Sequence, residues 1–160
     1  MRREHACARE VHPGESGFSL IEIMVVILII AILIAIAIPQ FLAARTRADD
    51  RATQSDLRNG LTAEKTVYTD TQQYYVNSTA VKAAEPSLHW GTKLLVQVGM
   101  NFVTDDTVCL SEQSASGTWF AVGDIADSSA NASAGTYFTK SATDPCTTDA
   151  TTISGWSQSW

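Results

Sequence analysis

The feature that most constrains this chain is an uninterrupted apolar segment near its N-terminus, residues 18–38. Ser19 and Glu22 carry its only polar side chains, so a helix built from it is apolar on every face. At about 1.5 Å per residue, this helix spans about 31 Å, the thickness of a bilayer's hydrocarbon core. We therefore expect lipid or other apolar helices to surround it.

Three interpretations of this segment compete. A secretory signal would be cut after Ala37, but the apolar run is longer than the usual core of about 7–15 residues, and Pro39 lies close to that cut. A plain single-pass anchor explains the length but leaves Glu22 unexplained, because a carboxylate costs about 2.5–3.5 kcal/mol at the bilayer centre and less near an end. The third interpretation is a segment cut between Gly17 and Phe18 and then used as a packing helix.

The third interpretation gives Glu22 a partner. Cleavage after Gly17 creates a new α-amine on Phe18, one helical turn before Glu22, so the carboxylate can meet an amine on its own chain or on a neighbour. A buried charge requires such a partner, and the helix dipole also favours a carboxylate in the first turn. The alternative is that Glu22 lies near the membrane boundary and simply extends to the polar interface.

The motif GFSLIE at residues 17–22, with the aliphatic run and Pro39 after it, resembles the N-terminus of type IV pilins and pseudopilins. The resemblance covers about residues 14–55. It implies that residues 1–17 are a leader removed by a prepilin peptidase, which cuts between Gly17 and Phe18, and that Phe18 is then N-methylated. It further implies that Glu22 pairs with the amine of Phe18 in an adjacent subunit during filament assembly.

The same resemblance implies the partners and the location. The chain would span the inner or cytoplasmic membrane once, then leave it for an extracellular pilus on the cell surface. Its partners would be other copies of itself, other pilins, the peptidase and the assembly platform in the membrane. Such leaders are usually basic, whereas residues 1–17 hold three arginines and three glutamates. Acidic residues count little in the positive-inside rule, but Arg45, Arg47 and Arg51 equal the number of arginines on the other flank, so the rule does not orient the segment.

A helical pattern continues beyond Pro39, and we predict one helix over residues 18–69. Pro39 lacks a backbone donor and should kink this helix near its position, with a helix end there as the alternative. The pair Asn59-Gly60 predicts a position of low helix stability, because glycine costs about 1 kcal/mol relative to alanine in a helix. Apolar and small residues recur every three or four positions and predict a stripe covered by a sheet, at Phe41, Ala44, Ala48, Ala52, Ser55, Leu57, Leu61 and Tyr68. Charged side chains within residues 45–51 form either a solvated face or a contact between subunits.

Residues 70–160 predict a small β head, so the fold class is α+β and pilin-like. We expect a connecting loop over residues 70–92 and then an antiparallel meander. Its strands are predicted at Lys93–Val98, Thr107–Glu112, Thr118–Ile125 and Gly135–Lys140. The polar tail carries Trp156 and Trp160, which favour packing onto the head over an adhesive role.

Cysteine spacing predicts a disulfide in the head. Cys7 lies in the leader, which leaves Cys109 and Cys146 as a pair with no cysteine or histidine at metal-ligand spacing nearby. Closing this loop would stabilise the fold by about 4 kcal/mol on the chain-entropy model.

The remaining chemistry argues against an enzyme. The formal charge of −6 makes nucleic acid an unfavourable partner. His89 is the one histidine after the leader, and no nucleophile has a matching base, so we predict no catalytic residues and no cofactor. Asp105, Asp106, Asp124 and Asp127 could gather around calcium, but turn-forming aspartates are favoured and we predict no metal site.

These features predict a structural subunit of a type IV pilus-like filament, polymerised through its N-terminal helix. A pseudopilin of a type II secretion or competence system is the alternative within the family. An anchored surface domain that binds a ligand and never polymerises is the alternative from another class.

Overall fold

The computed structural model describes residues 17–75, 79–98, 106–126, 133–146 and 155–160. It has two compact units, which divide between Phe41 and Leu42. The first unit holds the apolar segment, and the second holds the β head together with the later part of the long helix.

Helix α1 spans Leu20–Thr71 and begins after Ser19, whose carbonyl accepts hydrogen bonds from the N–H groups of Glu22 and Ile23 at 3.1 and 3.3 Å. Pro39 lies inside this helix, so the alternative that Pro39 ends it is wrong. The predicted kink near Pro39 stays a prediction.

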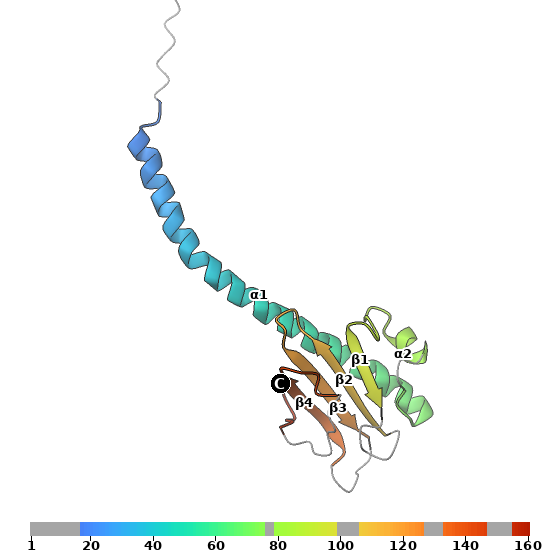
Figure 1. The fold of residues 1–160 in the computed structure, drawn as a ribbon. Helices are drawn as coiled ribbons and strands as arrows, with labels where there is room; N and C mark the ends of the chain where they lie inside the picture. The colour runs from blue at the N-terminus through green and yellow to red at the C-terminus, as the bar shows by residue number, and fades with distance from the viewer. Residues whose placement is uncertain (1–16, 76–78, 99–105, 127–132, 147–154) are drawn as a thin grey trace, which may run out of the picture. The chain divides into compact units, whose positions relative to one another are not determined.

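A four-stranded antiparallel sheet follows in the order β1-β2-β3-β4 (Figure 1). Its strands are β1 (Leu94–Val98), β2 (Thr107–Gln113), β3 (Trp119–Ile125) and β4 (Gly135–Ser141). Each lies within one residue of its prediction at either end, and neighbours in the sequence are neighbours in the sheet. The predicted α+β class and the meander are therefore confirmed.

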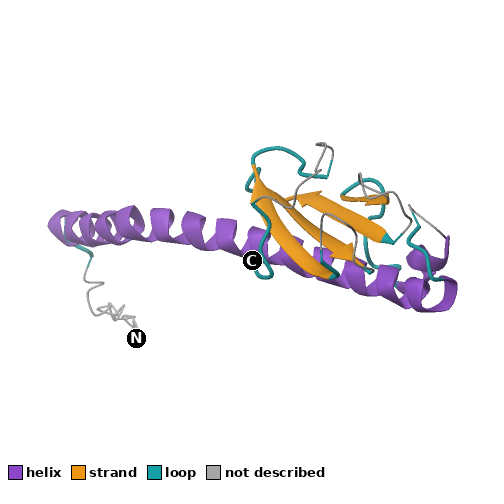
Figure 2. Ribbon diagram, turned by 90° about the horizontal axis from the view of Figure 1, so that it is seen from below, coloured by secondary structure: helices purple, strands orange, loops and turns teal. Residues whose placement is uncertain are grey.

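The later part of α1 runs along one face of the sheet (Figure 2). The main core consists of side chains from these two elements. Leu57 and Leu61 of the helix belong to one buried cluster with Leu94, Leu110 and Val122 of the strands. Side chains alternate between the two faces of a strand, so the sheet residues of this cluster share one face. The expectation that the sheet covers the helix is confirmed for this part of α1.

The opposite face of the sheet is covered by the C-terminal part of the chain. Cys109 and Ala121 on this face form a buried cluster with Cys146, and Trp156 packs against it. Cys109 and Cys146 are joined by a disulfide with a Cα–Cα distance of 5.9 Å. Ser157 exchanges backbone hydrogen bonds with Phe138 of β4, at 2.7 and 2.9 Å, which fixes the terminal residues at the edge of the sheet.

Gly60 lies at a close contact between the helix and the sheet. A Cβ at this position would be 2.8 Å from a methyl carbon of Leu94 and 2.8 Å from one of Leu110. Helix α1 continues through this point, and the expected lower helix stability at Asn59-Gly60 stays a prediction. The glycine allows the backbone to pack directly on two buried leucines.

The predicted loop after the long helix needs correction. Residues 70–92 are not simply a loop, because α1 continues to Thr71 and a short helix α2 spans Thr79–Ala84. Ala and Lys favour this helix, and it buries Val81 against Ala63 and Val67 of α1.

The early part of the predicted stripe is not covered by the sheet. Its members before Leu57 are exposed, namely Phe41, Ala44, Ala48, Ala52 and Ser55. The first buried residue of α1 is Thr53, and the first helix residue in the core shared with the sheet is Leu57. An apolar face of α1 is thus left uncovered beyond the head.

Candidate functional site

The N-terminal segment exposes nearly all of its apolar surface. Every residue from Gly17 to Ala48 is exposed, and the large hydrophobic side chains between Phe18 and Leu42 are 46–78% exposed. Helix α1 is the one helix among the described residues that is long and apolar enough to cross a membrane. A surface of this kind is stable only in lipid or against other apolar helices.

The residues expected for processing lie just before this helix. Gly17 has open space around it, since nothing lies within 4 Å of a Cβ built on it. Phe18 is 78% exposed and precedes the first helical residue, Leu20. Both residues that flank the expected cleavage point are thus exposed.

Glu22 lies in the first turn of α1, where its carboxylate is favoured by the helix dipole. Its side chain is exposed and, within the described part of the chain, has no cation at ion-pair distance. The structure does not pair Glu22 with Phe18, because in the uncut chain the nitrogen of Phe18 is an uncharged amide. Pro39 is also exposed, in the middle of the same apolar surface.

In the head, Asp124 is the centre of a buried polar network. Its carboxylate accepts hydrogen bonds from the hydroxyl of Tyr74 at 2.6 Å and from Thr136 at 2.5 Å, and it forms an ion pair with Lys65 at 2.7 Å. Burial raises the pKa of Tyr74, and the adjacent carboxylate of Asp124 raises it further. The network ties α1 and the segment after it to β3 and β4.

Glu64 is a second buried carboxylate, on the helix face that packs on the head. The side chain is fully buried, and neither carboxylate oxygen has a full hydrogen bond. Burial raises its pKa from 4.5 to about 7, although the backbone N–H of Tyr75 lies near enough to lower it slightly. This residue is therefore close to its titration midpoint at neutral pH.

Glu112 is buried on the helix-facing side of β2. Its carboxylate forms an ion pair with Lys93 at 2.7 Å, and Lys93 also reaches Asp56 of α1 at 3.2 Å. Burial raises the pKa of Glu112 despite this ion pair, and the hydrogen bond to Glu112 raises the pKa of Lys93. The arrangement links the sheet to the helix through charge as well as packing.

Two of the four aspartates considered for calcium have other partners in the structure. Asp124 is paired with Lys65, and Asp106 accepts a hydrogen bond from the hydroxyl of Tyr68 at 3.3 Å. Asp105 and Asp127 lie outside the described residues. Across the described ranges, no three side chains of histidine, cysteine, aspartate or glutamate gather at a distance suited to a metal.

Both C-terminal tryptophans pack onto the head, as the sequence favours. Trp156 lies over Gly123, where a Cβ would be 3.2 Å from its ring. Trp160 packs on Phe120 and Phe138. Its indole N–H is buried with no acceptor among the described residues, so the ring is held by packing alone.

The burial of Glu64, Glu112 and Asp124 was not predicted from the sequence, although the spacing of Glu64 and Asp124 indicates it. Glu64 follows Leu57 and Leu61 at helical spacing, which places it on the buried stripe. Asp124 follows Phe120 and Val122 at a spacing of two, which places it on the helix-facing side of β3. A carboxylate in phase with core residues indicates a buried group.

Comparison with known proteins agrees with the geometry of the N-terminal segment. Residues 13–38 match the family model described as "Prokaryotic N-terminal methylation motif". The chain is 38% identical over 63 residues to the type IV major pilin protein PilA of Myxococcus xanthus. It is 34% identical over 65 residues to the type IV wide pilus major component PilA4 of Thermus thermophilus.

These similarities cover only parts of the proteins compared. They include 39% and 41% of this chain, and the chain spans 29% of the length of the first relative and 50% of the second. The methylation motif lies on the exposed apolar segment, and the fold joins that segment to a four-stranded head. Over its N-terminal part, the chain thus carries the prokaryotic N-terminal methylation motif and is similar to type IV pilins.

Proposed function

We propose that this protein is a structural subunit of a type IV pilus-like filament. The single observation that carries the proposal is the helix surface from Phe18 to Leu42, which is apolar and exposed throughout and contains one carboxylate, Glu22. A membrane satisfies the apolar surface but not the carboxylate. A bundle of identical helices satisfies both if each subunit also brings a cation.

Processing supplies that cation. Cleavage between Gly17 and Phe18 converts an uncharged amide into an α-amine, and N-methylation of Phe18 keeps the positive charge. The amine of one subunit can then pair with Glu22 of the next. The subunit is held in the membrane through residues 18–38 and leaves it when helix packing and this ion pair replace the lipid contacts.

The partners follow from this sequence of steps. They are a prepilin peptidase, an assembly platform in the membrane with its motor, and other pilin subunits including further copies of this chain. Both relatives are named as pilins, which supports a structural rather than a catalytic role. The net charge of −6 makes nucleic acid an unfavourable electrostatic partner.

The test is a Glu22→Ala substitution in cells whose own copy is deleted, with Ser19→Ala as the matched control. Ser19 is the other polar residue of the segment, so the control removes polarity in the same turn without removing charge. We expect Glu22→Ala to leave the protein processed and in the membrane but to reduce surface filaments, seen by electron microscopy, at least about tenfold, since a buried amine then loses its partner. Ser19→Ala should keep the filaments.

Normal filaments with Glu22→Ala would show that the proposed ion pair is wrong. If the parental protein forms no surface filament and its deletion abolishes protein secretion or DNA uptake, the pseudopilin alternative is correct. If it forms none and stays in the membrane as a monomer, it is an anchored surface domain.

A further inference from the structure

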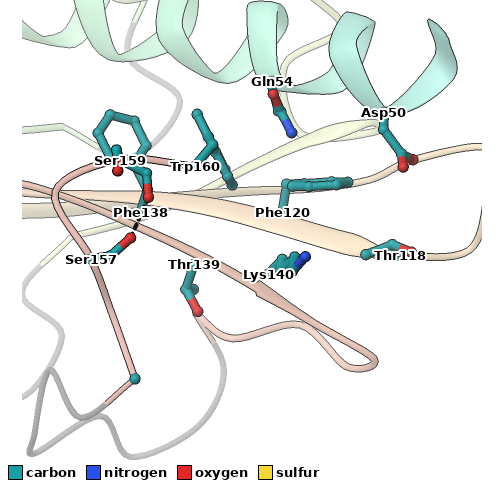
Figure 3. Close-up of a pocket in the computed structure, with 11 residues that line it drawn as sticks. Asp50, Gln54, Thr118, Phe120, Phe138, Thr139, Lys140, Ser157, Ser159 and Trp160 are labelled. Atoms are coloured by element: carbon teal, nitrogen blue, oxygen red, sulfur yellow. Dashed lines mark hydrogen bonds between the residues drawn. The ribbon is translucent and has the colours of Figure 1, made fainter. Parts of the chain in front are cut away.

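A pocket of about 500 Å³ lies in the second unit, between helix α1 and the strands β3 and β4 (Figure 3). Three aromatic rings line it, those of Phe120, Phe138 and Trp160. The ring of Trp160 lies between the other two, with centroids 5.2 Å from Phe120 and 5.1 Å from Phe138. The volume is in the range of about 300–1,000 Å³ typical of small-molecule sites.

Polar side chains surround this aromatic wall, and two of them have no internal partner. Asp50 and Gln54 project from α1 toward the strands, while Lys140 comes from β4 (Figure 3). Neither the amide of Gln54 nor the ammonium of Lys140 forms a hydrogen bond or ion pair with another described residue. Asp50 is held in place by the hydroxyls of Ser114 and Ser116, each 2.6 Å from its Oδ1.

The composition of the lining restricts the chemistry of a ligand. An entirely apolar ligand would leave the amide of Gln54 without a partner, at a cost that opposes binding. A ligand of a single charge would attract either Asp50 or Lys140 and repel the other. A neutral molecule with one apolar face and several hydroxyls avoids both problems, and a pyranose sugar is such a molecule.

We propose that this pocket binds a neutral saccharide, with the C–H face of one sugar ring against the aromatic wall and its hydroxyls bonded to Gln54, Asp50 and Lys140. Every contributing residue belongs to the second unit, so the site does not depend on the apolar segment or on polymerisation. The proposal goes beyond the filament function, and each of the two can be correct if the other is wrong.

The test is saturation-transfer NMR on the full chain in phosphocholine micelles, since glycoside detergents would compete for the pocket. The probes are glucose, galactose, mannose, N-acetylglucosamine and their disaccharides. We expect at least one to bind with a Kd below about 10 mM. Gln54→Ala and Lys140→Ala should each weaken that binding about fivefold, the effect of one lost hydrogen bond.

Matched controls are Gln158→Ala and Lys82→Ala, which remove the same kinds of side chain at exposed positions outside the pocket. Both should bind the sugar as the parent does. The proposal is overturned if no probe binds, if Gln54→Ala and Lys140→Ala bind like the controls, or if a free amino acid binds in this pocket and the sugars do not.

Discussion

Glu64 makes the stability of the head depend on pH. Its pKa is about 7 in the folded state against 4.5 for an ordinary glutamate, so the folded state binds its proton more tightly than the unfolded state. The stabilisation is complete below about pH 4.5 and is lost as pH rises through 7. A rise in pKa from 4.5 to about 7 corresponds to a total change of about 3.4 kcal/mol at most in the free energy of unfolding.

A Glu64→Gln variant should remove this dependence. We expect it to unfold at higher urea concentration than the parent at pH 8, by about 1–3 kcal/mol in the free energy of unfolding, because no charge is then buried. At pH 5 the two proteins should differ much less. The measurement is urea unfolding of the full chain in micelles, followed by tryptophan fluorescence.

The control for this experiment is Glu85→Gln, at a half-buried carboxylate that follows α2. Its pH profile should match that of the parent. Glu112 also titrates with a raised pKa, so the informative quantity is the difference between the parent and each variant. Equal pH profiles for the parent and Glu64→Gln would contradict the account of Glu64.

Among the elements, the long helix depends on close contact at Gly60. Alanine there would improve helix propensity by about 1 kcal/mol, but its Cβ would meet Leu94 and Leu110 at 2.8 Å. Overpacking of a core costs about 1–3 kcal/mol, so we expect Gly60→Ala to lower the free energy of unfolding by about 1 kcal/mol.

The matched control is Asn59→Ala, one residue earlier on the exposed side of α1. It gains helix propensity without entering the core, so it should stabilise the head slightly in the same urea titration. If Gly60→Ala stabilises the protein as much as Asn59→Ala does, the close approach is not a constraint.

Some elements could be predicted from the sequence, because local patterns fix them. The short run from Thr118 to Ile125 is rich in β-forming residues and bounded by turn residues, and this placed β3 to within one residue. The close packing of Gly60 on the sheet could not be predicted from local patterns. It depends on Leu94 and Leu110, which are distant in the sequence, whereas propensity alone indicates only a weak helix position.

The candidate sites also differ in whether local sequence or folding brings their residues together. Gly17, Phe18 and Glu22 form a short linear motif, so the sequence alone could single them out. The pocket between α1 and the strands could not be predicted, because Asp50, Phe138 and Trp160 become neighbours only after folding. Trp160 could be assigned to packing from its aromatic character, but the sequence does not indicate its place between two phenylalanines.

At the scale of the whole molecule, the two units differ in what they leave unsatisfied. The head buries its own apolar core and pairs Asp124 and Glu112 with lysines. The first unit exposes its apolar side chains and a carboxylate. The second unit therefore covers its own apolar core. The first unit requires lipid or further copies of the chain to cover its apolar helix.

Whether cleavage supplies a cation for Glu22 is decided by mass spectrometry of the N-terminal peptide of the protein recovered from surface filaments. We expect a chain that begins at Phe18 with a methylated amine, because only this end supplies the cation that Glu22 requires. A filament protein that begins at Met1, or at Ile38 after cleavage as a secretory signal, would show that Glu22 has no such partner and that the proposed assembly is wrong.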